Sequence, residues 1–280
     1  MTPISILAAL TTEAATPSVL KVAEVIARRA PVHVTGLHTL GAIAIYPGIA
    51  IHIPAPAHES FNNAQTAQAE AIKVMFDDFA DDDAFSSRWR LIQADSINAA
   101  DRMVESALTA DLVVIAQEDR DSDRPDQRGA PEALIRRSGR PVIVVPRGWE
   151  SPTLGKSIVI GWSATRESAR AAHDAVALAE PGATIHILVA DPSPTSRSEE
   201  MDTAKELAAK LDRLGFEANV IAAEVSYRTI AEALQDAADE HGADLIAVGA
   251  FGHSRIYDFV MGAVTTELLE NERRPVLFSK

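Results

Sequence analysis

An internal repeat of about 133 residues constrains the fold more than any other feature of the sequence. The run ADLVVIA at Ala110–Ala116 is matched 133 positions later by ADLIAVG at Ala243–Gly249. Further on, RPVIVV at Arg140–Val145 recurs as RPVLFS at Arg274–Ser279, 134 positions away. This period is longer than the ~20 to 50 residues of a solenoid unit. It therefore predicts two tandem copies of one domain, 1–150 and 151–280, joined by a segment rich in Pro and Gly.

Within each copy, short runs rich in Val, Ile and Leu alternate with helical patterns. Because these runs are continuously apolar, they indicate strands buried on both faces, which is typical of a parallel sheet flanked by helices. We therefore predict an α/β fold in which each domain is a Rossmann-like, five-stranded parallel sheet. Ligands of such sheets bind at the carboxyl ends of the strands, where the strand order reverses. In the second copy the expected strands are 157–162, 183–189, 217–222, 244–249 and 275–278, and the expected helices are 165–179, 199–214, 227–240 and 256–271.

Composition excludes several classes of function. The formal net charge of −14 opposes binding to nucleic acid or to an anionic membrane. The chain has no cysteine, so thiol chemistry and thiolate metal sites are excluded, and we expect a cytoplasmic protein. Residues 1–10 do not resemble a signal peptide. The apolar stretch 41–57 is broken by three prolines, which argues against a membrane span; we expect an insertion that packs on a neighbouring domain or subunit, with a lid over a ligand as the alternative.

Metal ligands are not evident in the sequence. None of the eight histidines pairs with another at metal-ligand spacing on one helix face. The acidic cluster at 77–83 lacks the glycine and the terminal glutamate of a calcium loop. A solvated helix end is the expected role of that cluster.

The candidate chemistry lies after the fourth strand of the second copy, where the sequence reads GAFGHSR from Gly249 to Arg255 and reaches Gly262 after a helical run. Glycines let backbone N–H groups converge on an anion, and the following helix N-terminus adds a favourable dipole. His253 and Arg255 add positive charge. A GxxG pair alone also fits a simple tight turn. Gly262 favours the anion site, because a glycine within a helix costs about 1 kcal/mol relative to alanine and so asks for a reason.

The spacing of Gly249, Gly252 and Gly262 resembles that of the universal stress protein family, in its ATP-binding branch. The likeness extends from Asp244 through Phe278, and the order of strands and helices in both halves fits as well. The resemblance implies a fold of the adenine nucleotide alpha hydrolase type. It also implies that ATP, AMP or another adenine nucleotide binds across the carboxyl ends of strands one and four, either with or without Mg²⁺.

The resemblance also assigns binding residues, two of which depart from the family pattern. Ser163 stands where an Asp or Asn usually contacts the nucleoside, and Ala263 stands where a Ser or Thr usually follows the third glycine. Loss of one hydroxyl contact at Ala263 costs about 0.5 to 1.5 kcal/mol, or up to roughly tenfold in affinity. Val189 matches the position that faces adenine, and Trp162 either stacks on the base or fills the gap between sheet and helix. The implied phosphate contacts are Gly252, His253, Gly262, Ala263, Val264 and Thr265.

The first copy has lost this loop. Where the second copy reads Gly249 to Gly252, the first reads Ala116, Gln117, Glu118 and Asp119. These residues add side chains and two carboxylates where phosphates would lie, so we predict that the first half does not bind nucleotide.

No catalytic residue is evident, because the sequence has no Gly-x-Ser-x-Gly elbow, Walker lysine loop or HExxH motif. The leading hypothesis is a tandem universal stress protein that binds an adenine nucleotide in its second domain and acts as a regulatory or protective module. One alternative is slow ATP hydrolysis at the same loop, and another is an interaction protein that no longer binds nucleotide. We expect the two domains to pair within the chain, and the sequence leaves a homodimer open.

Overall fold

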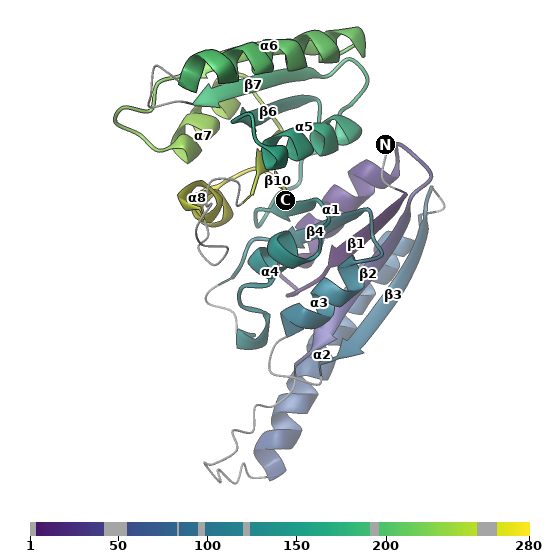
Figure 1. Cartoon of the computed structure of the whole chain (residues 1–280). Coiled ribbons are helices and arrows are strands. Elements are labelled where there is room, and N and C mark those ends of the chain that lie inside the picture. The colour runs from purple at the N-terminus through teal and green to yellow at the C-terminus, as the bar shows by residue number, and fades with distance from the viewer. Residues whose placement is uncertain are drawn as a thin grey trace.

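A computed structural model describes residues 4–41, 55–82, 84–94, 99–119, 124–190, 196–250 and 262–280. It shows one sheet with helices on both faces, and every pair of neighbouring strands except one is parallel (Figure 1). The predicted α/β fold with a parallel sheet flanked by helices is therefore confirmed. In the described part of the chain, no helix is both long enough and apolar enough to cross a membrane.

The N-terminal half contributes five strands in the order β3-β2-β1-β4-β5. The order reverses between β1 and β4, so the carboxyl ends of these two strands form the switch point of this half. The elements are β1 (Ser5–Ala9), α1 (Thr16–Ala27), β2 (His33–Leu40), α2 (Ala55–Ala80), β3 (Ser86–Gln93), α3 (Ala99–Ala107), β4 (Leu112–Ala116), the 3₁₀ helix η1 (Pro125–Gln127), α4 (Ala130–Arg137) and β5 (Val142–Val145).

The C-terminal half repeats this order as β8-β7-β6-β9-β10, with its switch point between β6 and β9. All five predicted strands are present. The helix expected at 256–271 was placed wrongly at Gly262, because this residue has an extended backbone and serves as the N-cap of a helix that begins at Ala263; residues 256–261 lie outside the described part. The elements are β6 (Ser157–Trp162), α5 (Arg166–Leu178), β7 (Thr184–Ala190), α6 (Ser196–Arg213), β8 (Glu217–Ala223), α7 (Ile230–Glu240), β9 (Leu245–Gly249), α8 (Ala263–Asn271) and β10 (Val276–Ser279).

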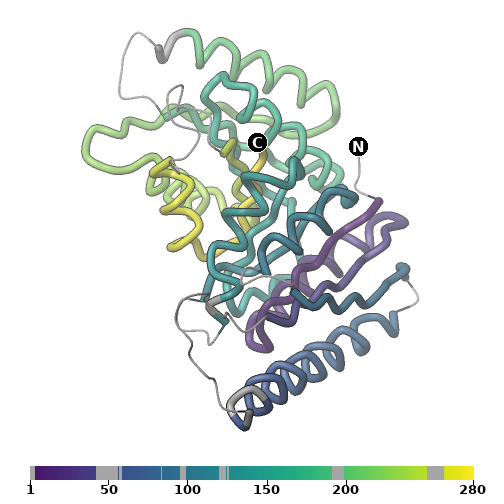
Figure 2. Tube along the Cα trace, turned by 60° about the horizontal axis from the view of Figure 1, so that its bottom comes forward, coloured from purple at the N-terminus to yellow at the C-terminus, as the bar shows by residue number. Residues whose placement is uncertain are grey.

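The two halves share a single sheet instead of forming two separate ones. Strand β10 pairs antiparallel with β5, with Leu277 opposite Ile143, and this pairing joins the two sets into ten strands. In Figure 2 the yellow C-terminal strand accordingly lies beside the teal middle of the chain. Arg29, at the end of α1, also crosses the joint, where it donates hydrogen bonds to the carbonyl oxygens of Leu154 (2.6 Å) and Leu178 (3.2 Å) and pairs with Glu180 (2.7 Å).

The core consists of two apolar layers, one on each face of the sheet, and each layer contains residues of both halves. The central strands β4 and β5 are buried along their whole length, as expected of strands covered on both faces. The long helix α2 lies along β2 and β3 on the N-terminal half (Figure 2). Gly36 lets α2 approach, because a Cβ atom at this position would lie 2.4 Å from the ring of Phe76.

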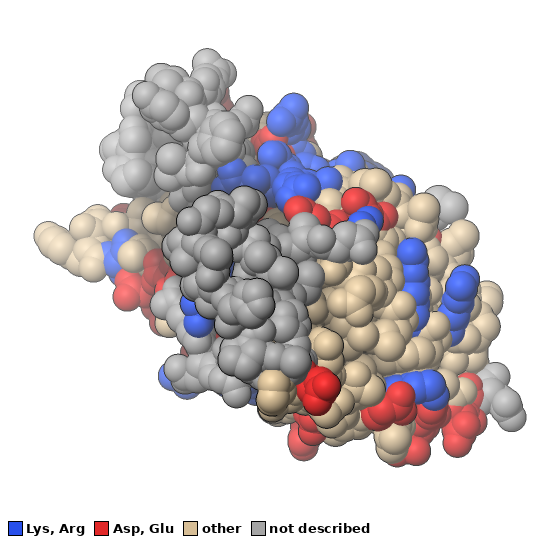
Figure 3. Space-filling view, turned by 90° about the horizontal axis from the view of Figure 1, so that it is seen from below, with Lys and Arg blue, Asp and Glu red and all other residues tan. Residues whose placement is uncertain are grey.

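Both signs of charge occur on the surface. The face in Figure 3 carries Lys and Arg side chains as well as Asp and Glu side chains, several of them side by side. Exposed pairs such as Arg137 with Asp101 (2.6 Å) contribute about 0 to 1 kcal/mol each. In the acidic cluster at the end of α2, Asp77 pairs with Lys73 and Asp82 pairs with Arg28. Of the insertion expected at 41–57, residues 42–54 lie outside the described residues, so its predicted packing stays a prediction, whereas residues 55–57 form the start of α2.

Candidate functional site

The candidate site lies at the switch point of the C-terminal half, where β6 and β9 end and where the first turn of α5 packs against the end of β9; α8 follows β9 along the chain. Strand β6 leads into a tight turn at 163–165, in which Ala164 has a φ of 49°. A positive φ is unusual for a residue with a side chain. Thr165 caps α5 by accepting a hydrogen bond from the backbone N–H of Ser168 (3.3 Å), and the Ser168 hydroxyl accepts one from the N–H of Ser163 (3.2 Å). The turn therefore presents Ser163 at the carboxyl end of β6.

Trp162 fills the space between the sheet and α6. Its indole Nε1 donates to the hydroxyl of Thr203 (3.0 Å), and the half-buried ring packs against the apolar layer on that face. Of the two expected roles for this residue, the structure shows the packing one. Val189, at the end of β7, is also buried in the core, with 1% of its surface exposed. Only the main chain of Val189 is therefore left to contact a base.

The structure gives a packing reason for glycine at position 249, and this reason was not evident from the sequence. A Cβ atom on this residue would lie 2.5 Å from the carbonyl carbon of Glu167 and 2.5 Å from the nitrogen of Ser168. Both are backbone atoms of the first turn of α5, so neither can move cheaply. The lack of a side chain at Gly249 thus allows α5 to pack against the end of β9, a role separate from the phosphate approach expected from the sequence.

Gly262 shows the opposite pattern. The nearest described atom to a Cβ built on it is the hydroxyl of Thr265, at 4.0 Å, and its φ of −62° suits any residue. Nothing in the described part of the chain therefore requires glycine here by crowding. The same residue is the N-cap of α8, and among the described residues no side chain caps this helix and no acidic residue lies in its first turn.

Among the described residues, no side chain holds the N-terminus of α8, which leaves its N–H groups available to an anion. The first N–H groups of a helix have no partner within the helix, and they carry the positive end of its dipole. Ala263 is exposed, Val264 is half-buried and Thr265 is buried. The neighbouring helix α7 differs, because Thr229 and Glu232 form a complete capping box at its N-terminus. Gly252 and His253 lie outside the described residues, so their predicted contacts are neither supported nor contradicted.

The N-terminal half offers an internal comparison at its own switch point. Its α4 also has a glycine at the N-cap, Gly129, which precedes Gly262 by 133 positions. Here the carboxylate of Glu118 accepts a hydrogen bond from the N–H of Gly129 (3.0 Å). A side chain of the protein thus holds the place that an anion takes at a helix N-terminus. The comparison of the two repeats in the sequence drew attention to the carboxylates of this loop but not to Gly129. The 133-residue period of the repeat places Gly129 at the position equivalent to Gly262.

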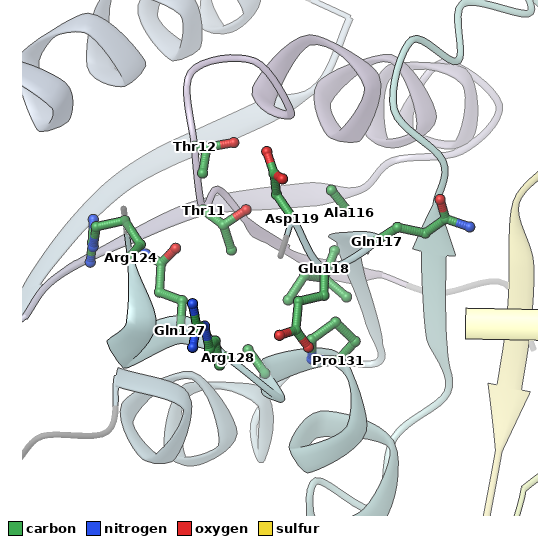
Figure 4. A pocket seen from close by; sticks show the side chains of 12 residues that line it. Thr11, Thr12, Ala116, Gln117, Glu118, Asp119, Arg124, Gln127, Arg128 and Pro131 are labelled. Atoms are coloured by element: carbon green, nitrogen blue, oxygen red, sulfur yellow. The ribbon is translucent and has the colours of Figure 1, made fainter. Parts of the chain in front are cut away.

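The pocket beside Glu118 is small and charged (Figure 4). It measures about 20 Å³, enough for roughly one water molecule and far less than a nucleotide needs. Side chains from the ends of β1 and β4 and from 124–131 line it, among them Thr11, Glu118 and Arg124.

Arg124, one of the residues that line this pocket, is buried. Its side chain is 6% exposed. It donates to the carbonyl oxygen of Thr39 (2.6 Å) and to the side-chain oxygen of Gln68 (2.8 Å), and it pairs with Asp126 (2.9 Å). Arg124 also lies 3.4 Å from Nε2 of the buried His38. Nothing in the local sequence indicated that this arginine is buried.

Comparisons with known proteins agree with this geometry. The family model described as the universal stress protein family matches residues 155–280. A universal stress protein from Archaeoglobus fulgidus is similar in structure over 99% of this chain and 96% of its own, with a TM-score of 0.73 and 13% identity. A putative universal stress protein from Pseudomonas aeruginosa is similar over 99% and 93%, with a TM-score of 0.57 and 18% identity. No curated protein matches the chain.

At these identities the structural matches show a shared fold, and that fold spans both halves of the chain. The family model adds the sequence pattern of the C-terminal half, which contains β6, β9 and α8. The chain therefore has the fold of the universal stress proteins that it matches over both halves, and its residues 155–280 match the model of the universal stress protein family.

Proposed function

We propose that the C-terminal half binds ATP, AMP or another adenine nucleotide, with the phosphates at the N-terminus of α8. The observation that carries this proposal is the open N-cap at Gly262, which nothing in the described protein crowds and which no described side chain caps. The glycine spacing from Gly249 to Gly262 and the family match support it. The protein would act in the cytoplasm as a regulatory or protective module that responds to nucleotide levels.

The chemistry of the site is that of binding. The N–H groups of the first turn of α8 and the hydroxyl of Thr265 supply donors for phosphate oxygens, and the helix dipole favours their negative charge. The nucleoside would contact the main chain of Val189 and the hydroxyl of Ser163. Ser163 Oγ lies 3.3 Å from the Thr165 hydroxyl, so it would leave that contact in order to bind a ribose. This exchange favours moderate affinity.

The test separates binding from folding at Gly262. Aspartate is a favourable N-cap residue and fits the backbone at this position, so Gly262→Asp should preserve or raise the melting temperature. Its carboxylate would lie at the N-terminus of α8, as the carboxylate of Glu118 lies at the N-terminus of α4. There it would repel phosphate. Isothermal titration calorimetry with ATP should therefore show at least about a fivefold loss of affinity, because one well-placed like charge opposes binding by on the order of 1 kcal/mol or more.

The matched control is Gly262→Ala, which adds a side chain without charge and has room to do so. It should bind ATP within about threefold of the wild type, since neither a donor nor a charge changes. Equal ATP affinity in Gly262→Asp and Gly262→Ala would overturn the placement of the phosphates. Wild-type protein that binds neither ATP nor AMP, and that releases no adenine nucleotide on denaturation, would overturn nucleotide binding as the function.

A further inference from the structure

Helix α8 has few attachments to the rest of the described protein. Its one fully buried apolar side chain is Leu268, and Glu267 accepts a hydrogen bond from the hydroxyl of Thr229 at the start of α7 (2.9 Å). At the other end, the carbonyl oxygen of Glu272, the C-cap, accepts a hydrogen bond from the Gln117 side chain (2.7 Å). The last carbonyl groups of a helix lack intrahelical partners, and Gln117 supplies one from the opposite half of the chain.

Residues 117–119, which follow β4, are each held by a contact with the rest of the N-terminal half. The backbone N–H of Gln117 donates to the carbonyl oxygen of Val145 (2.8 Å). Glu118 holds the N-terminus of α4, and Asp119 pairs with Arg147 (3.0 Å). These contacts fix the backbone from which the side chain of Gln117 extends. The C-terminal half keeps the same main-chain bond, from the N–H of Ala250 to the carbonyl oxygen of Ser279 (2.8 Å).

Glu272, the partner of Gln117 in this contact, is itself held in place. The residue is 4% exposed, and one of its carboxylate oxygens accepts the backbone N–H groups of Arg273 (2.8 Å) and Arg274 (3.1 Å). A buried carboxylate that is tied to its own backbone resists displacement, because moving it would leave its charge without hydrogen bonds. Strand β10 begins four residues later and is itself paired with β5. The C-terminal end of α8 is thus set by the N-terminal half.

We propose that Gln117 is a positioning residue for the nucleotide site: it holds the C-terminal end of α8 so that the opposite end faces the phosphates. This inference rests on the proposed function. The loop that lost its own glycines then supports the helix of the retained site. Because coupling between two sites is reciprocal, bound nucleotide should in turn strengthen the contact between Gln117 and Glu272.

The test replaces the donor of Gln117 without changing its shape. Gln117→Glu has no N–H group and places a carboxylate beside the Glu272 carbonyl, whereas Gln117→Lys restores a donor. ATP affinity by calorimetry should fall about two- to tenfold in Gln117→Glu, the usual effect of losing one hydrogen bond, and should return to within about twofold of wild type in Gln117→Lys. Gln93→Glu is the matched control, since Gln93 also donates to a backbone carbonyl, that of Gly41 (3.4 Å), within the N-terminal half.

Two readouts separate positioning from stability. Without nucleotide, hydrogen exchange at α8 should be faster in Gln117→Glu than in wild type, while the melting temperature should stay near that of Gln93→Glu. Equal ATP affinity in wild type and Gln117→Glu would overturn the role of Gln117 and leave the nucleotide site standing. An equal loss of affinity in Gln93→Glu would overturn it too. Absence of ATP binding in the wild type would overturn both proposals.

Discussion

Replacing His38 by asparagine tests how the N-terminal half keeps a buried imidazole neutral. The Nδ1 atom of His38 lies 2.6 Å from the carbonyl oxygen of Leu10, which accepts only, so Nδ1 carries the proton. Nε2 then faces the guanidinium group of Arg124 at 3.4 Å, where a second proton would be repelled. Burial, with a further contribution from the charge of Arg124, lowers the pKa of His38 from 6.5 to about 4, although the bond to Leu10 and the charge of Asp126 act in the opposite direction.

The sign and size of the effect follow from linkage. Because the folded pKa lies below the unfolded value, the unfolded chain binds more protons between about pH 6.5 and pH 4, and the free energy of unfolding falls as the pH drops through this window. A pKa difference of one corresponds to about 1.4 kcal/mol, so the full effect is about 3 kcal/mol. Between pH 7.5 and pH 5 it amounts to about 2 kcal/mol.

Urea unfolding at pH 7.5 and at pH 5 measures this contribution. His38→Asn keeps a donor toward Leu10 but has no group that titrates in this range, so its stability should fall by about 2 kcal/mol less than that of the wild type across the two pH values. His33→Asn is the control, because His33 is half-buried on the same strand and bonds Ser86 instead (2.8 Å). The same pH dependence in wild type and His38→Asn would refute the argument.

Two further predictions concern glycines that allow close packing. Gly249→Ala should lower the free energy of unfolding by about 1 to 3 kcal/mol, since the new Cβ would lie 2.5 Å from backbone atoms of Glu167 and Ser168; urea unfolding checks this, and unchanged stability would show that α5 can move away. Gly36→Ala should cost a similar amount because its Cβ would meet Phe76 at 2.4 Å. Phe76→Leu should recover part of that loss when combined with Gly36→Ala, so thermodynamic additivity of the two changes would contradict the contact.

The central strands were predictable because burial on both faces leaves a continuous apolar run in each of them. The edge strands β3 and β8 carry a weaker pattern, because many of their residues are exposed. Val113, Val114 and Ile115 in β4 need no partner elsewhere in the sequence to be recognised. The antiparallel pairing of β5 with β10 could not be predicted from the sequence. Both strands look like ordinary members of their own sheets, and which free edges meet depends on how the two halves pack.

The candidate site was predictable only in part, for a related reason. Gly262 carried a local signal, since glycine in an expected helix needs an explanation. Gly249 stood out only as the first glycine of the spacing, at the end of an expected strand, and the explanation for it lies in the backbone of α5, which is distant in sequence. Arg124 had no signal at all: its burial depends on acceptors at Thr39, Gln68 and Asp126, and only the fold brings these together.

Antiparallel pairing of β5 with β10 gives the joint the form of a two-fold contact, the arrangement that two identical chains would use to make a dimer. In such a dimer every substitution appears twice, so a carboxylate that fills one helix N-terminus would fill both. Here the two partners are separate stretches of one polypeptide, and each can change alone. Glu118 can thus occupy the N-cap at Gly129 while no described side chain caps the helix at Gly262, and covalent linkage keeps the two unlike halves together in a constant one-to-one ratio.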